Sequence, residues 1–269
     1  MEGILFSFDS IFIFKLVLSF LVGGSVISFA ILAAERFSPK ISGIILGLPI
    51  ASAIGLFFIG FTQTEQIAAQ AATVMPITLA LGTIFLFLFA YTYEKLKLWV
   101  SLALGLLVFL AFSSAAVYFG FTNIFVNSLI HLIVVACIVI AFKSMGKKES
   151  AAAKAGATET IARGIFAGLV ISLSVIVAKI AGPYWGGMFA AFPASYVSTV
   201  IITTKSHGVG FLRAIIKNIP LATIGTLLYY IAVNQLYPLY GIWIGTAAGY
   251  AIALLWVVFA DKIKLFSAF

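Results

Sequence analysis

The sequence predicts an all-α integral membrane protein with nine transmembrane helices, arranged as two four-helix repeats of opposite orientation around one unpaired helix. Three observations predict this fold: the composition, the distribution of basic residues, and an internal repeat. Of the 269 residues, 63% are hydrophobic and 9% are charged, whereas a soluble domain has about 25% charged residues. A chain with so much apolar surface needs lipid as its solvent.

Nine apolar runs are long enough to cross a bilayer, because a spanning helix needs about 20 mostly apolar residues. They cover residues 12–34, 41–61, 71–92, 97–119, 122–142, 161–181, 186–204, 215–235 and 238–260. The longest connector, 143–160, carries several lysines in an Ala/Gly/Ser background and predicts a solvated linker. The chain is therefore expected to divide into a first repeat, a linking helix with a cytoplasmic linker, and a second repeat, at 1–120, 121–160 and 161–269.

Basic residues gather on one side of the predicted membrane. Lys and Arg near helix ends stay in the cytoplasm, and of the sixteen in the chain only Lys15 and Lys179 break this pattern. The formal charge of +8 therefore indicates orientation and argues against nucleic-acid binding, since the charges lie in connectors and form no single basic face. We expect a plasma-membrane protein with its N-terminus outside and its C-terminus in the cytoplasm.

The repeat is visible in the prolines. Six of the seven form three pairs, each separated by 144 residues: Pro39 with Pro183, Pro49 with Pro193, and Pro76 with Pro220. The same offset pairs Gly24 with Gly168, Ser28 with Ser172, Gly43 with Gly187, Trp99 with Trp243 and Gly105 with Gly249. Proline and glycine mark special backbone geometry in membrane helices, so these matches mean more than matched leucines.

The offset relates the first four predicted spans to the last four and leaves residues 122–142 unpaired. Five crossings separate the starts of the two copies, and an odd number turns the second copy upside down. Such inverted repeats are typical of secondary transporters, in which the binding site lies near the bilayer midplane between the halves.

The repeat unit resembles the GlpM-like inner-membrane proteins. Their Gly-x-x-x-x-Phe-Pro signature is similar to the stretch that runs from Gly187 to Pro193, and the stretch from Gly43 to Pro49 departs from it by a Leu before the proline. An Ala-Lys element precedes the signature in that family, as Lys179 does here, whereas the first copy carries Glu35. The resemblance covers each four-helix half. It implies a duplicated four-helix fold and supplies no activity or substrate.

Two proline breaks are the predicted functional site. Pro49 and Pro193 lie about eight residues into their spans, roughly 12 Å along a helix, and enter from opposite sides. Proline frees the carbonyl four residues earlier, and we expect the neighbouring glycines, including Gly47, to permit unwinding. Freed carbonyls and small hydroxyls in a dry environment can bind an ion or a polar solute. The hydroxyls that follow the breaks are those of Ser52, Ser195, Tyr196, Ser198 and Thr199.

Two further residues are candidates with structural alternatives. Lys179 either attracts an anionic solute at the outer mouth or extends to the lipid headgroups. His131 lies four residues after Asn127, on the same helix face, and either titrates during transport or forms a neutral hydrogen bond between helices.

Several function classes receive no support from the sequence. No Asp or Glu lies deep in a predicted span, which disfavours a carboxylate-based proton or cation antiporter. No nucleotide, zinc or hydrolase motif is present, and Cys137 is the single cysteine. We therefore expect no enzyme activity, no cofactor and no metal. Membrane lipid is the expected partner, and the sequence leaves the oligomeric state open.

The leading hypothesis is a secondary transporter or facilitator for a small polar or anionic solute, or a lipid headgroup, by alternating access at a midplane site. The alternative is a non-transporting scaffold or accessory subunit for envelope assembly. A transporter needs a polar cavity between its halves, whereas a scaffold has a dry closed core.

The topology is testable by cysteine accessibility. In a Cys137→Ser background, Ser7→Cys should react with an impermeant thiol reagent only from outside, and Ser267→Cys only from the cytoplasm. Reaction of both cysteines from the same side would contradict an odd number of crossings.

Overall fold

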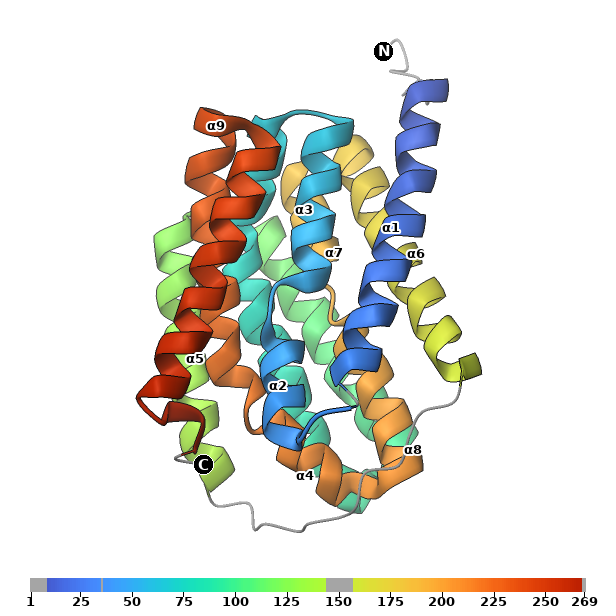
Figure 1. Cartoon of the computed structure of the whole chain (residues 1–269), viewed down its shortest axis with the longest axis vertical. Helices are drawn as coiled ribbons and strands as arrows, with labels where there is room; N and C mark the ends of the chain where they lie inside the picture. The colour runs from blue at the N-terminus through green and yellow to red at the C-terminus, as the bar shows by residue number, and fades with distance from the viewer. Residues whose placement is uncertain (1–8, 35, 144–156, 268–269) are drawn as a thin grey trace.

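The computed structural model describes residues 9–34, 36–143 and 157–267, and these are almost entirely helical (Figure 1). The predicted linker 144–156 and Glu35 lie outside the described residues. In chain order the elements are α1 (Ser10–Ala34), α2 (Pro39–Gly47), α3 (Ile50–Thr62), α4 (Glu65–Tyr118), α5 (Ile124–Lys143), α6 (Ala157–Ala181), α7 (Pro183–Ala190), α8 (Ala194–Ile216), α9 (Ile219–Lys262) and a short 3₁₀ helix (Leu265–Ser267).

Within the described part of the chain, seven helical stretches are long and apolar enough to cross a membrane. In two of them, 39–62 and 183–205, a pair of consecutive helices makes up the stretch. The protein is thus an all-α, multi-pass membrane protein, as its composition predicts. Large apolar side chains on the outer faces of α1, α4, α5, α6 and α9 are exposed, which is the arrangement expected of helices in contact with lipid.

Two helices are far longer than a bilayer is thick. The 54 residues of α4 would measure roughly 80 Å if straight, against about 30 Å of hydrocarbon. A residue with extended backbone angles interrupts each long helix: Lys97 in α4 (φ 61, ψ −178) and Gly241 in α9 (φ 76, ψ 172). These two residues are 144 positions apart. The predicted spans 71–92 and 97–119 are therefore the two arms of α4, and 215–235 and 238–260 are the two arms of α9.

The first arm of α4 begins six residues before the predicted start at 71. Thr64 caps it, because the Thr64 hydroxyl accepts a hydrogen bond from the Ile67 amide at 3.2 Å, and Glu65 places a negative charge in the first turn. Both features stabilise a helix N-terminus. A span prediction based on apolar length misses such a polar first turn.

The predicted breaks at the two prolines are confirmed. Pro49 separates α2 from α3 and has φ −75 and ψ 35, and Pro193 separates α7 from α8 and has φ −77 and ψ 48. The near-identical angles occur at positions 144 apart. Each proline acts as the N-cap of the helix that follows it, where its missing N–H removes no helical hydrogen bond.

The expected role of the glycines near these breaks was wrong. Gly43 and Gly187 lie within α2 and α7 and have no positive φ. They permit close approach instead: a side chain at Gly43 would collide with the Ile215 carbonyl oxygen, and one at Gly187 would collide with the Ala71 carbonyl oxygen. Adding 144 to Gly43 and subtracting 144 from Ile215 converts one contact into the other.

The seam between α1 and α6 shows the same reciprocity. A methyl group added at Gly24 would lie 2.7 Å from the Gly164 carbonyl oxygen, and one added at Gly168 would lie 2.7 Å from the Phe20 carbonyl oxygen. The two contacts exchange when each residue is replaced by its partner 144 positions away. Small residues let the two backbones pack closely, which is a main source of helix association in lipid.

Equivalent helices run in opposite directions. In Figure 1, α1 runs away from the end at which the N-terminus lies, whereas α6 runs toward that end. Likewise α2 followed by α3, and α7 followed by α8, run opposite ways. The helices also exchange neighbours between the halves: α4 packs on α7, and α9 packs on α2. The remaining helix, α5, packs on α4 and α9.

Gly187→Ala should destabilise the fold, because its Cβ collides with main chain that has little room to move. Overpacking of this kind costs about 1–3 kcal/mol, measurable as a loss of unfolding free energy in mixed micelles. Gly82→Ala is the matched control, since its new Cβ would find the nearest heavy atom at 3.6 Å. Equal stability of both variants would contradict close packing of α7 on α4.

Candidate functional site

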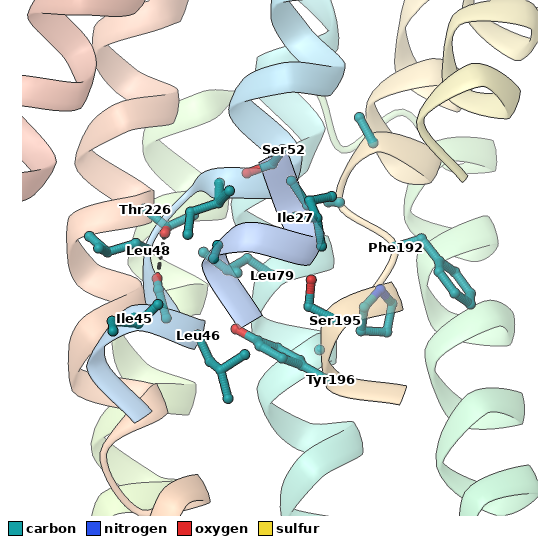
Figure 2. A pocket seen from close by; sticks show the side chains of 18 of the residues that line it. Ile27, Ile45, Leu46, Leu48, Ser52, Leu79, Phe192, Ser195, Tyr196 and Thr226 are labelled. Carbon is teal, nitrogen blue, oxygen red and sulfur yellow. Dashed lines mark hydrogen bonds between the residues drawn. The ribbon is translucent and has the colours of Figure 1, made fainter. Parts of the chain in front are cut away.

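A pocket lies where the two broken segments meet (Figure 2). Its volume is about 60 Å³, enough for a few water-sized groups. The walls come from both breaks together with α1, the first arm of α4 and the first arm of α9. The breaks thus form one shared site in the interior of the helical bundle.

Six pairs of lining residues are separated by 144 positions. They are Leu46 and Ala190, Gly47 and Ala191, Leu48 and Phe192, Ala51 and Ser195, Ser52 and Tyr196, and Gly82 and Thr226. The backbone of the pocket is therefore built twice from equivalent segments. Its side chains differ between the two copies.

At the first break, local hydrogen bonds replace the lost helical ones. The Leu48 amide donates to the Ile45 carbonyl at 3.2 Å, and the Ile50 amide donates to the Leu48 carbonyl at 2.8 Å. The Gly47 carbonyl accepts a hydrogen bond from the Thr226 hydroxyl at 2.6 Å, drawn as a dashed line in Figure 2. A side chain of α9 thus satisfies a carbonyl that the break leaves without a helical partner.

The second break has the same local bonds. The Phe192 amide donates to the Phe189 carbonyl at 3.0 Å, and the Ala194 amide donates to the Phe192 carbonyl at 2.7 Å. The counterpart of Thr226 is Gly82, which has no side chain to reach Ala191. The two breaks therefore share a backbone but differ in one cross-helix hydrogen bond.

Hydroxyl groups supply the polarity of the pocket. Ser52 is 7% exposed and its hydroxyl makes a long bond of 3.4 Å to the Pro49 carbonyl. Tyr196 is also 7% exposed, and among the described residues its hydroxyl has no hydrogen-bond partner. Figure 2 shows Tyr196 reaching from α8 toward α2, with Ser195 beside it. Tyr230, from α9, lies next to Ser52.

The structure brings five of the ten predicted site residues into this pocket: Gly47, Ser52, Pro193, Ser195 and Tyr196. Pro49 caps α3 next to the pocket but is not part of its wall. Ser198 donates to the Ser195 carbonyl at 3.0 Å. Thr199 is buried away from the pocket, and its hydroxyl has no partner in the described part of the chain. Both residues follow the break on faces of α8 that leave the pocket.

Lys179 does not reach the pocket. Its ammonium group lies over the Phe12 ring of α1, 3.9 Å from the ring centroid. Lys15 makes the corresponding contact on α3, over the Phe61 ring at 4.3 Å, and also donates to the Phe61 carbonyl. Aromatic faces attract cations, so both lysines have partners close to the helix ends.

His131 also lies outside the pocket, buried between α5 and α9. Its Nε2 is 3.2 Å from the Thr223 hydroxyl, which donates to the Pro220 carbonyl at 2.6 Å. Because that hydrogen is already used, Nε2 is the donor to Thr223 and Nδ1 of the neutral ring is an acceptor. Nδ1 is buried with no partner among the described residues, as is Oδ1 of Asn127. This geometry matches the expected hydrogen bond between helices.

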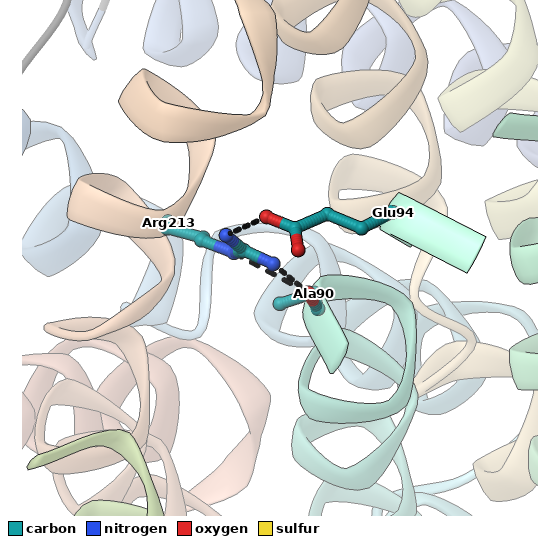
Figure 3. Close-up of polar contacts among 3 residues, drawn as sticks. All are labelled: Ala90, Glu94 and Arg213. Atoms are coloured by element: carbon teal, nitrogen blue, oxygen red, sulfur yellow. Dashed lines mark hydrogen bonds and ion pairs between the residues drawn. The ribbon is translucent and has the colours of Figure 1, made fainter. Parts of the chain in front are cut away.

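Arg213 binds within the protein at the end of the bundle opposite the N-terminus (Figure 3). Its guanidinium contacts the Glu94 carboxylate at 2.8 Å and donates to the Ala90 carbonyl at 2.7 Å. These bonds join α8 to the first arm of α4 near Lys97. A structural role accounts for the contacts of Arg213.

Sequence reasoning missed Thr226 and Tyr230, and the apolar wall made by Ile27, Leu79 and Gly82. A signal for the first two exists, since Thr223, Thr226 and Tyr230 follow one another at spacings of three and four residues and share one face of α9. No metal site accompanies the pocket: the described residues hold no group of three His, Cys, Asp or Glu placed as ligands.

Thr226→Val should lower the unfolding free energy by about 1–3 kcal/mol, because it leaves the buried Gly47 carbonyl without its donor. Chemical denaturation in mixed micelles measures this difference. Thr226→Ser retains the hydroxyl and should stay close to the parent protein. A valine variant as stable as the serine variant would contradict the importance of this bond.

Comparison of the chain with protein-family models, with curated proteins and with solved structures gives no match, so the function is argued from the geometry of this site alone.

Proposed function

We propose that this protein is a secondary transporter or facilitator of the plasma membrane that moves a small polar or anionic solute, or a lipid headgroup, by alternating access. The observation that carries the proposal is the pocket shared by the two breaks, because equivalent segments from both halves form its walls. Broken helices that meet between repeats are the usual binding site of such transporters.

The proposed topology has nine crossings in a 4+1+4 arrangement. Dividing α4 at Lys97 and α9 at Gly241 raises the seven candidate crossings to nine. An odd number agrees with the opposite ends at which the termini lie in Figure 1. The basic residues favour a cytoplasmic C-terminus and an external N-terminus.

The two halves are proposed to be inverted copies related by a two-fold axis in the membrane plane. The exchanged contacts of Gly24 and Gly168, and those of Gly43 and Gly187, support a two-fold relation. The opposite directions of α1 and α6 support an axis in the plane rather than along the membrane normal. This arrangement is the one implied by the resemblance of each half to GlpM-like proteins.

Alternating access follows from this symmetry. The pocket lies at the interface of the halves, so a rocking motion of one half against the other would open it first to one side and then to the other. The glycine contacts along α1 and α6 bring backbone against backbone, and such smooth seams contain few interlocking side chains to oppose sliding. Every described residue of the pocket wall is uncharged, which suits a polar solute or a single negative charge better than a metal cation.

Ser195→Cys, in a Cys137→Ser background, tests alternating access. Because Ser195 lines the pocket, we expect a small impermeant methanethiosulfonate reagent to modify this cysteine from either side of the membrane. Modification is measured in oriented vesicles by mass shift of the intact protein.

Ser113→Cys is the matched control, because Ser113 is fully buried in the second arm of α4 and lies outside the pocket. It should stay unmodified from both sides. A pocket cysteine that reacts from neither side would favour the scaffold alternative, and one that reacts from one side only would contradict alternating access.

A further inference from the structure

The helix N-termini of α3 and α8 meet at the pocket, and each leaves two amide groups without an acceptor. The first four N–H groups of a helix have no partner within that helix. In α3, the Ile50 and Ala53 amides bind the Leu48 and Pro49 carbonyls, at 2.8 and 2.7 Å. Among the described residues, no main-chain acceptor serves the remaining two amides, of Ala51 and Ser52.

The same accounting holds for α8. The Ala194 and Val197 amides bind the Phe192 and Pro193 carbonyls, at 2.7 and 2.8 Å. The amides of Ser195 and Tyr196 have no main-chain acceptor within the described ranges. These residues are 144 positions from Ala51 and Ser52, and all four line the pocket. Two helix N-termini therefore supply four hydrogen-bond donors to one cavity, from opposite directions.

A second and independent observation is the Tyr196 hydroxyl. Its side chain is 7% exposed and lines the pocket, yet this hydroxyl has no partner in the described structure. A buried polar group that lacks a partner is costly. A ligand that accepts hydrogen bonds would satisfy the hydroxyl and the four amides together.

The wall restricts the charge of that ligand. The described lining residues include neither a carboxylate to hold a cation nor a basic group to balance a dianion. The partial positive charge of helix N-termini favours a negative ligand, whereas a second negative charge in a dry pocket would be expensive to desolvate without a counter-charge. The volume of about 60 Å³ admits only a few non-hydrogen atoms.

We infer that the pocket binds a small monovalent oxyanion of the size of acetate, held by the amides of Ala51, Ser52, Ser195 and Tyr196 and by the Tyr196 hydroxyl. This inference rests on the proposed function and names its substrate class. Carboxylate oxygens accept several hydrogen bonds at once, and bonds to a charged acceptor are the stronger kind.

Acetate and acetamide form a matched pair of probes, because they have nearly the same shape and differ in charge. The full chain in lipid nanodiscs, with gluconate as the bulky background anion, is titrated with sodium acetate, acetamide or sodium sulfate, and its melting temperature is recorded. Acetate should raise the melting temperature saturably, since a ligand that binds only the folded state stabilises it. Acetamide and sulfate should leave the temperature unchanged. Stabilisation by acetamide equal to that by acetate, or none by acetate, would overturn the inference.

Variants locate the site. Tyr196→Phe should weaken acetate binding by roughly tenfold or more, as expected for a bond to a charged group, without lowering the stability of the unliganded protein. Tyr237→Phe is the control: its hydroxyl is 2.7 Å from that of Thr246, outside the pocket, so this variant should lose stability but retain acetate affinity. Equal acetate affinity of both variants would place the anion elsewhere and overturn the inference.

The accessibility test on Ser195→Cys separates the two conclusions. Labelling from both sides without acetate stabilisation leaves transport standing and overturns the anion. Acetate stabilisation of a pocket that is never labelled from both sides supports the anion site and overturns alternating access.

Discussion

The fold depends on the constraint that main-chain polar groups in lipid need partners inside the protein. A helix that stops at Leu48 and restarts at Ile50 exposes carbonyls and amides in the interior of a membrane bundle. This protein meets most of that need locally, through the tight bonds at both breaks, and meets one further need through Thr226. The breaks are consequently surrounded by helices on all sides. The few groups left over point to a ligand.

The unpaired helix α5 has a place in the same scheme. Its Asn127 donates to the Thr73 carbonyl at 2.8 Å, three residues before Pro76, and its His131 contacts Thr223, three residues after Pro220. The two prolines are equivalent positions of the two halves. One face of α5 thus braces both halves at the same point. A helix without a counterpart can link the copies in this way without joining the exchange of contacts.

The sequence predicted the helical breaks because proline has a local and unconditional effect on a helix. It predicted the repeat because the offset of 144 recurs in residues with special backbone roles. It failed on the purpose of the glycines: Gly43 is small because Ile215 lies against it, and a contact 172 residues away leaves no local trace. The pocket residues on α9 were missed for the same reason, since Thr226 reads as an ordinary threonine until Gly47 is placed beside it. Ser198 and Thr199 were included because they follow the break, but the pocket wall ends within one helical turn.

The unequal partners Thr226 and Gly82 give the molecule a preferred resting state. In the proposed cycle, a chain with identical halves would spend equal time open to each side, because the two forms would be mirror arrangements of the same contacts. A hydrogen bond present at one break and absent at the other removes that equality. A net difference of about 1 kcal/mol corresponds to about a fivefold ratio of populations. Gene duplication followed by a single polar substitution is therefore sufficient to convert an even two-way gate into one with a default direction.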